Sequence, residues 1–220
     1  MINMYKPSGL SWKDDPQYIG HLAVLSKLKE ENFQPKVIYD IGSCEGNWTE
    51  MATTIWPNCE FYLFDANEDL NELYKERKYD YYLGLLSKTN DEQIKYYYNE
   101  TFIAGNSYYK ELTEAYSDDT YRILNSATLD KVIDNNTWPM PDLIKMDVQG
   151  SELDILEGGK KILSQAKYLI VELQHIEYND SAPLFEESIA TIEKSGWKLI
   201  NSKFSSSDYA IDADYLFKKL

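Results

Sequence analysis

Residues 37–49 read VIYDIGSCEGNWT, a short apolar run that ends in an acid and leads into two glycines. The run has the length and composition of a buried strand, and residues 45–56 predict a helix directly after it. Glycine lets the backbone turn tightly and approach a ligand, while the start of a helix offers unpaired N–H groups. This strand, loop and helix therefore predict a ligand site at the carboxyl end of a first strand.

The rest of the chain alternates short apolar runs with longer segments of mixed polarity, which is typical of βαβ units and a mostly parallel sheet. We expect strands at residues 36–42, 60–65, 81–86, 142–148, 168–173, 197–201 and 208–218, and helices at 16–29, 45–56, 68–78, 151–165 (broken at two glycines) and 183–195. The last two strands are expected to form an antiparallel edge. Residues 91–126 are the least regular part, with an extra strand suggested by QIKYYYN (93–99), and such insertions often carry the substrate surface.

The length, composition and charge of the chain exclude several kinds of protein. The chain has 220 residues, 43% of them hydrophobic, and a net charge of −15. These values predict a folded protein, which we divide into an N-terminal arm and helix (1–32) and one domain (33–220). The charge argues against binding to nucleic acid. Apolar runs too short to span a bilayer, no evident secretory signal and only two cysteines favour a cytoplasmic protein that does not insert into membranes.

Two acids at the ends of predicted strands indicate the kind of ligand. Asp40 precedes a GxxxG spacing, which differs from the GxGxxG of dinucleotide-binding loops, and it would repel a phosphate but attract an ammonium group. Asp65 ends the next strand, where an acid is suited to accept hydrogen bonds from ribose hydroxyls. S-adenosylmethionine has a ribose, a cationic amino-acid portion and no phosphate. The alternative is an ordinary turn with small residues for packing and acids that cap helices.

A second dense stretch, residues 142–159, reads DLIKMDVQGSELDILEGG. Alternation along a strand puts Lys145, Asp147 and Gln149 on one face, at the carboxyl end where open α/β sheets bind ligands. The alternative is a simple Lys145–carboxylate pair followed by a helix start, which would also explain Glu152 near the positive end of a helix.

Taken in order, these segments resemble the FkbM family of class I S-adenosylmethionine-dependent methyltransferases. The resemblance rests on VIYDIGSCEGNWT (37–49), FYLFDAN (61–67), TLDKVI (128–133), PDLIKMDVQGSELDILEGG (141–159) and YLIVELQ (168–174). It implies a Rossmann-like α/β fold with a mostly parallel seven-stranded sheet, an antiparallel last strand, and helices on both faces.

The resemblance also implies where the cofactor would lie. Its methionine end is expected near Asp40 and the glycines, its ribose on Asp65, and its adenine near Ala66 and the residues after the third strand. The full set of expected cofactor residues is Asp40, Gly42, Ser43, Gly46, Thr49, Asp65, Ala66, Asn67, Ser87 and Asp147. Two positions depart from the family pattern. Asp65-Ala66 replaces the usual glutamate-proline pair, and Gln149 replaces a glutamate, so Gln149 can orient a hydroxyl but cannot take its proton.

Three residues are candidates for the general base that an acceptor hydroxyl benefits from. Asp147, Glu172 and His175 all lie near the carboxyl ends of central strands. The pKa of an unperturbed histidine suits base chemistry at neutral pH, although His175 could equally be an ordinary loop residue. Asp147, Glu172 and Gln174 could also hold a divalent cation, but the resemblance does not imply one, and we expect no metal.

The sequence thus predicts an S-adenosylmethionine-dependent methyltransferase that acts on a hydroxyl of a sugar, a glycan or another small metabolite. The substrate class comes from the resemblance alone. The alternative is a non-catalytic cofactor-binding or glycan-binding protein that has kept the fold, and Gln149 leaves that alternative open. The oligomeric state is not predicted.

Overall fold

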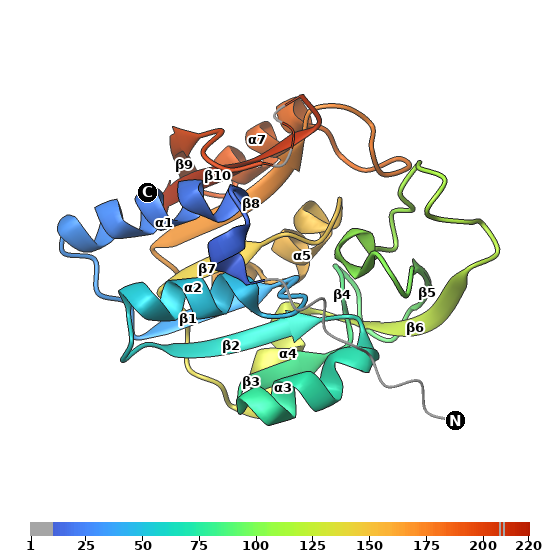
Figure 1. The fold of residues 1–220 in the computed structure, drawn as a ribbon, viewed down its shortest axis with the longest axis horizontal. Helices are drawn as coiled ribbons and strands as arrows, with labels where there is room; N and C mark the ends of the chain where they lie inside the picture. The colour runs from blue at the N-terminus through green and yellow to red at the C-terminus, as the bar shows by residue number, and fades with distance from the viewer. Residues whose placement is uncertain (1–10, 207, 209) are drawn as a thin grey trace.

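The computed structural model of the protein describes residues 11–206, 208 and 210–220, and its centre is a seven-stranded sheet (Figure 1). Along the sheet the strands are β3 (Asp80–Leu83), β2 (Glu60–Asp65), β1 (Val37–Ile41), β7 (Leu143–Met146), β8 (Tyr168–Gln174), β10 (Asp212–Lys219) and β9 (Trp197–Ser202). Strands β3, β2, β1, β7 and β8 run parallel, and β10 lies antiparallel between β8 and β9. This confirms the predicted fold class.

Helices cover both faces of the sheet. One face carries α1 (Gln17–Glu30), α2 (Asn47–Ile55) and α3 (Asn71–Arg77), and the other carries α4 (Leu129–Asn136), α5 (Glu152–Gly158), α6 (Lys160–Leu163) and α7 (Phe185–Lys194). Three short 3-10 helices are η1 (Trp12–Asp14), η2 (Glu68–Leu70) and η3 (Ile103–Gly105). None of the helices in the described part of the chain is long and apolar enough to cross a membrane.

Strand β1 shows why the sheet forms where it does. All five of its residues are buried, with Tyr39 and Ile41 packed toward α4 and Ile38 packed toward α1 and α2. A strand in the middle of a parallel sheet is covered on both faces, so its sequence is nearly continuous in apolar residues. Complete burial of a side chain such as Ile38 contributes about 1.5–3 kcal/mol. Asp40 is the polar exception, and it lies on the same face as Ile38.

The N-terminal helix α1 is packed into the same core as the sheet. Val24, Leu25 and Leu28 join Trp48 of α2 and Ile38 of β1 in one buried cluster. The helix therefore lies close to the ends of the central strands, although the sequence predicted it as part of an extension.

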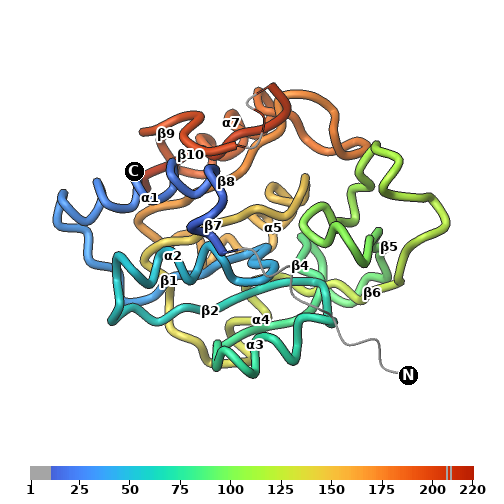
Figure 2. The backbone as a smooth tube through the Cα atoms, in the orientation of Figure 1, coloured from blue at the N-terminus to red at the C-terminus, as the bar shows by residue number. Residues whose placement is uncertain are grey.

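A second, three-stranded sheet lies beside the main one, with the order β4 (Leu85–Leu86), β6 (Tyr121–Ala127), β5 (Gln93–Tyr97). The strand predicted over residues 81–86 is divided at Gly84, so that β3 joins the main sheet and β4 joins the small one. Strand β5 confirms the extra strand predicted from QIKYYYN, whereas β6 was not predicted. We call residues 91–126 the insertion. Figure 2 shows it as a lobe, drawn in green, next to the carboxyl ends of β1, β2 and β7.

Gly42, immediately after β1, offers a test of this packing. Its φ of +77° is in the left-handed region, and a Cβ atom there would lie 1.7 Å from the carbonyl oxygen of Asp147. Gly196 has a similar φ of +90°, but a Cβ atom there would meet nothing nearer than Lys219 Nζ at 3.5 Å. We expect Gly196→Ala to cost about 1–2 kcal/mol from backbone strain alone. Gly42→Ala should cost several kcal/mol more, because β7 must also shift.

Urea unfolding of both variants, followed by circular dichroism, measures the two free energies. Equal losses of stability in the two variants would contradict the close packing of the first loop against Asp147.

Candidate active site

A cavity lies at the carboxyl ends of β1, β2 and β7, and we call it the inner cavity. The volume of this cavity is about 60 Å³, which is small, and the hollow that adjoins it is much larger at about 790 Å³. Four of the predicted cofactor residues line it: Gly42, Asp65, Ala66 and Asp147. The opposite wall consists of β4 together with parts of the insertion, which are Tyr96 of β5, Ile103 of η3 and residues after η3 such as Tyr108.

The loop after β1 fixes the position of Asp65. The backbone N–H groups of Gly42 and Ser43 both donate to the carbonyl of Phe64, at 2.9 and 3.1 Å. Cys44 N donates to Asp65 Oδ2 and Asn67 N donates to Asp65 Oδ1, each at 2.8 Å. Burial raises the pKa of Asp65 to about 6, although these two hydrogen bonds oppose that shift. The carboxylate is therefore held rigidly at the wall of the inner cavity.

The other predicted cofactor residues do not line the inner cavity. Asp40 is fully buried, and its Oδ2 accepts a hydrogen bond from Thr49 Oγ1 at 2.7 Å. Its Oδ1 has no hydrogen-bond partner among the described residues, and burial raises its pKa. Ser43 Oγ lies 2.7 Å from Tyr74 OH, so Ser43 and Thr49 support the loop from behind. The predicted residues outside the cavity lining are Asp40, Ser43, Gly46, Thr49, Asn67 and Ser87.

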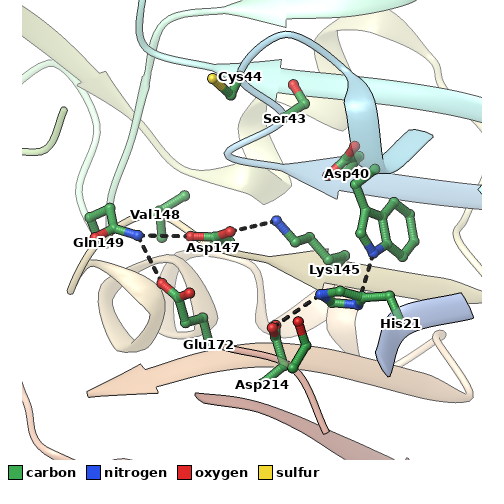
Figure 3. Close-up of polar contacts among 12 residues, drawn as sticks. His21, Asp40, Ser43, Cys44, Lys145, Asp147, Val148, Gln149, Glu172 and Asp214 are labelled. Atoms are coloured by element: carbon green, nitrogen blue, oxygen red, sulfur yellow. Dashed lines mark hydrogen bonds and ion pairs between the residues drawn. The ribbon is translucent and has the colours of Figure 1, made fainter. Parts of the chain in front are cut away.

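Next to the inner cavity, Asp147 and Glu172 form a carboxylate pair joined by a glutamine (Figure 3). Gln149 Nε2 donates to Asp147 Oδ1 at 3.0 Å and to Glu172 Oε2 at 2.8 Å. Lys145 Nζ lies 2.9 Å from the other oxygen of Asp147. The sequence-based grouping of Lys145, Asp147 and Gln149 is thus observed, although β7 ends at Met146 and Gln149 has a left-handed φ of +55°.

The pKa values of the two acids of the pair are shifted in opposite directions. Burial alone would raise the pKa of Asp147, but the adjacent Lys145 ammonium and its hydrogen bond hold it below the usual range. Burial raises the pKa of Glu172 well above its ordinary value, and the negative charges of Asp147 and Asp214 add to that effect. Asp147 is therefore the more acidic of the two carboxyl groups, and Glu172 holds a proton more strongly.

Strand register explains why so many charges meet here. Neighbouring residues in register on paired strands point to the same face, and β1 pairs Asp40 with Lys145 while β8 pairs Glu172 with Asp214. Lys145 lies among these acids and is only 5% exposed to solvent. Burial alone would lower the pKa of Lys145, but the charges of Asp147, Asp40 and Asp214 raise it. A buried cation is tolerated only with such compensation.

The N-terminal helix completes this cluster. His21 Nε2 lies 3.0 Å from Asp214 Oδ2, and Trp48 Nε1 donates to His21 Nδ1 at 3.1 Å (Figure 3). His21 is buried, in agreement with the structural role that its place beside an apolar helix stripe suggests.

A wider hollow, which we call the outer groove, continues from the inner cavity toward solvent. The two share six residues, which are Gly42, Cys44, Ile103, Ala104, Asp147 and Gln149. Glu172, Lys145, Tyr178 and Asp212 line the outer groove from the sheet side, and Tyr18 lines it from α1. Asp147 therefore lies where the two hollows meet, and Glu172 lies beside it in the outer groove.

His175 and Gln174 are not brought into this arrangement. His175 Nε2 lies 2.6 Å from Tyr215 OH, and its ring packs edge-on against Phe185 and Tyr215. Gln174 is buried and donates to Asn179. Neither residue lines the inner cavity or the outer groove. Within the described part of the chain, no three histidines, cysteines or acids are grouped so that they could hold a metal ion.

Several residues of the site were not singled out from the sequence. Cys44 lies between the two glycines of the quoted loop and could have been included on that ground. The insertion was expected to carry substrate contacts, but its irregular pattern did not indicate Tyr96, Ile103 or Ala104 individually. Nothing in the sequence indicated Tyr18, because helix periodicity does not show which residues reach over a neighbouring sheet.

Comparison with known proteins agrees with this geometry. The model described as "Methyltransferase FkbM domain" matches residues 40–199, which is most of the chain. This chain belongs to the FkbM methyltransferase family. The match confirms the family resemblance inferred from the sequence. The chain is therefore a member of a family of S-adenosylmethionine-dependent methyltransferases.

Among curated proteins, the hexuronic acid methyltransferase AglP of Haloferax volcanii is 24% identical over 182 residues, covering 79% of this chain and 71% of AglP. Two solved structures share the fold. The precorrin-6y C5,15-methyltransferase of Geobacter metallireducens GS-15 has a TM-score of 0.52 at 12% identity, with 97% and 94% of the two chains covered. The magnesium protoporphyrin IX methyltransferase of Synechocystis PCC 6803 with bound SAH has a TM-score of 0.55 at 10% identity, with 99% and 91% covered.

The carboxylate pair makes a prediction about stability and pH. The raised pKa of folded Glu172 means that its favourable contribution is complete below the unfolded pKa of about 4.3 and is lost as pH rises. The Glu172→Gln variant has no carboxyl group at this position, so it cannot lose stability through ionisation there. Its free energy of unfolding should therefore fall less between pH 4.5 and pH 8 than that of the unaltered protein. Urea unfolding at several pH values measures this difference.

Asp147→Asn serves as the control of opposite sign. The pKa of folded Asp147 is lowered, so its contribution is present above about pH 3.9 and is lost in acid. This variant should lose stability at neutral pH and approach the unaltered protein in acid. If Glu172→Gln became unstable with rising pH as steeply as the unaltered protein, the proton on Glu172 would be wrongly assigned.

Proposed function

We propose that this FkbM family member is an S-adenosylmethionine-dependent O-methyltransferase that acts on a hydroxyl of a sugar, a glycan or a small metabolite. The observation that carries the proposal is the junction between the two hollows. The inner cavity is bounded by Asp65 and the glycine loop and shares Asp147 with the outer groove, which Glu172 also lines. A donor in the cavity and an acceptor in the groove would meet at these carboxylates.

The residues of the inner cavity fit S-adenosylmethionine. Asp65 is fixed by two backbone N–H groups and can accept hydrogen bonds from ribose hydroxyls, and Ala66 and Leu86 offer apolar contacts to the adenine. No lysine or arginine among the described residues lines this cavity, which suits a ligand without phosphates. The two acids that line it, Asp65 and Asp147, suit a cation. When bound, the cofactor supplies a methyl group on a sulfonium.

The chain's own residues position the acceptor and take its proton. Asp147, kept ionised by Lys145, can accept a hydrogen bond from the acceptor hydroxyl. Glu172, with its higher pKa, is the stronger base of the pair once ionised, and it lies one glutamine amide away. Correct positioning in such a site can supply about 7–11 kcal/mol in favourable cases. We leave His175 out of this mechanism, because its ring nitrogen lies against Tyr215.

Similarity to AglP supports a sugar as acceptor, since that protein is named for hexuronic acid. Both arginines of the chain form ion pairs with acids, which supports the proposal that nucleic acid is not a partner. Arg77 is paired with Glu50 and Arg122 with Asp69, so neither is available as part of a basic face. A cytoplasmic location remains a prediction from the sequence.

The cofactor assignment can be tested by calorimetric titration with S-adenosylhomocysteine. Asp65→Asn should weaken binding about tenfold or more, because it removes a charged hydrogen-bond acceptor worth about 1.5–3 kcal/mol. Asp80→Asn, at the opposite end of the neighbouring strand β3, is the matched control and should leave the affinity unchanged. Absence of any binding to the unaltered protein would reject the methyltransferase proposal as a whole.

The catalytic assignment can be tested by single-turnover methyl transfer from labelled S-adenosylmethionine to a panel of glycans. Asp147→Asn should reduce the rate by about 10²-fold or more while the affinity for the cofactor stays nearly intact. An unchanged rate would remove Asp147 from the mechanism. Tight cofactor binding without transfer to any acceptor would instead favour the alternative of a non-catalytic binding protein.

A further inference from the structure

The outer groove has an unusual balance of charge. Its lining contains seven acids, which are Asp15, Glu45, Glu100, Glu111, Asp147, Glu172 and Asp212. Lys145 is the only basic residue among the described residues that line it. An acceptor that enters the groove therefore meets a surface that is negative or able to accept hydrogen bonds over most of its area.

Lys145 cannot serve as a binding partner for an anion. Its Nζ lies 2.9 Å from Asp147 Oδ2, it is 5% exposed, and the charges of Asp40 and Asp214 act on it from the sheet. Withdrawing it toward a ligand would leave Asp147 ionised and unpaired in a largely buried position, which is strongly unfavourable. The chain's two arginines, Arg77 and Arg122, are paired with acids and do not line the groove.

The acids of the groove differ in how readily they ionise, and their protonation determines which groups they can bind. Burial raises the pKa of Glu172 and of Asp212. Glu111 is only 6% exposed and accepts a hydrogen bond from Thr113. Asp147 stays ionised. Ionised carboxylates accept hydrogen bonds from hydroxyl and ammonium groups and cannot donate, whereas Glu172 and Asp212 can each donate one hydrogen bond while they are protonated.

A metal ion could in principle carry an anion into such a groove. The described residues contain no cluster of three acids, histidines or cysteines arranged to hold one. A carboxylate, phosphate or sulfate on the acceptor would therefore meet mostly like charge in the groove, with neutral hydrogen-bond donors such as Asn47 and Tyr178 but no available cation to balance it.

We propose that the acceptor is a polyhydroxy compound with no anionic group on the ring that enters the outer groove, and that a protonated amine on that ring favours binding. The proposal rests on the methyltransferase function proposed above and specifies its substrate class. It separates this chain from a methyltransferase that acts on uronic acids: the closest chemical match is a neutral or amino sugar.

Matched sets of acceptors test the proposal at low ionic strength. Each set contains the methyl glycosides of a neutral hexose, the corresponding amino sugar and the corresponding uronic acid, in the gluco, galacto and manno series. With labelled S-adenosylmethionine, we expect kcat/KM for the uronic acid to be at least tenfold below that of its neutral counterpart. The amino sugar should equal or exceed the neutral sugar, and added salt should narrow the gap.

A charge variant provides a second measurement. Glu100 lines the groove and is exposed on the insertion, so Glu100→Gln should raise the relative rate with the uronic acid. Glu114→Gln removes a charge from the same insertion outside the groove and should leave the ratio unchanged. Equal or faster transfer to uronic acids by the unaltered protein would overturn the proposal and leave the methyltransferase function standing. Binding of S-adenosylhomocysteine without transfer to any acceptor would overturn both.

Discussion

A lysine buried in the middle of the sheet is the constraint on which the site depends. Lys145 is removed from water by the strands on either side and by the helices above, and its charge is balanced by the acids that β1, β7 and β10 place around it. Removing the lysine would leave these carboxylates to repel one another in a region of low dielectric, and removing the acids would leave a buried cation. The charged residues therefore have to be understood as one unit.

This dependence links the fold to the chemistry. The order of the strands brings Asp40, Lys145, Glu172 and Asp214 to one face because each lies at an in-register position near the end of its strand. Helix α1 closes the cluster through His21. The same arrangement gives two neighbouring acids different affinities for a proton, which is the usual basis for assigning acid and base roles in an enzyme.

Much of this architecture could be predicted from the sequence, for a physical reason. Strands such as β1 and β8 are covered on both faces, so their apolar runs are unambiguous, and Lys145 and Asp147 stand out within such a run. Strand β6 was missed because its exposed positions include the large hydrophobic residues Tyr121 and Ile123, so the alternating exposure of the strand is not matched by an alternation of apolar and polar residues.

The site itself was predicted less completely. Spacing identified the loop after β1, but it could not show that Ser43 and Thr49 support the loop while Cys44 faces the cavity. His175 was judged by its place after β8, whereas its environment is set by Tyr215, which is 40 positions further along the chain. Contacts of this kind depend on strand β10 lying between β8 and β9, and no local pattern encodes that arrangement.

The contact between Gly42 and the carbonyl of Asp147 has a consequence for how this protein can vary. The loop after β1 and the residue after β7 touch through backbone atoms, with no side chain between them to absorb a displacement. A change that moves the backbone of one of these segments therefore moves the other as well. The insertion, by contrast, forms a wall of the site as a lobe of its own, so it is the part of the chain that can diverge in selectivity while the joined loops stay as they are.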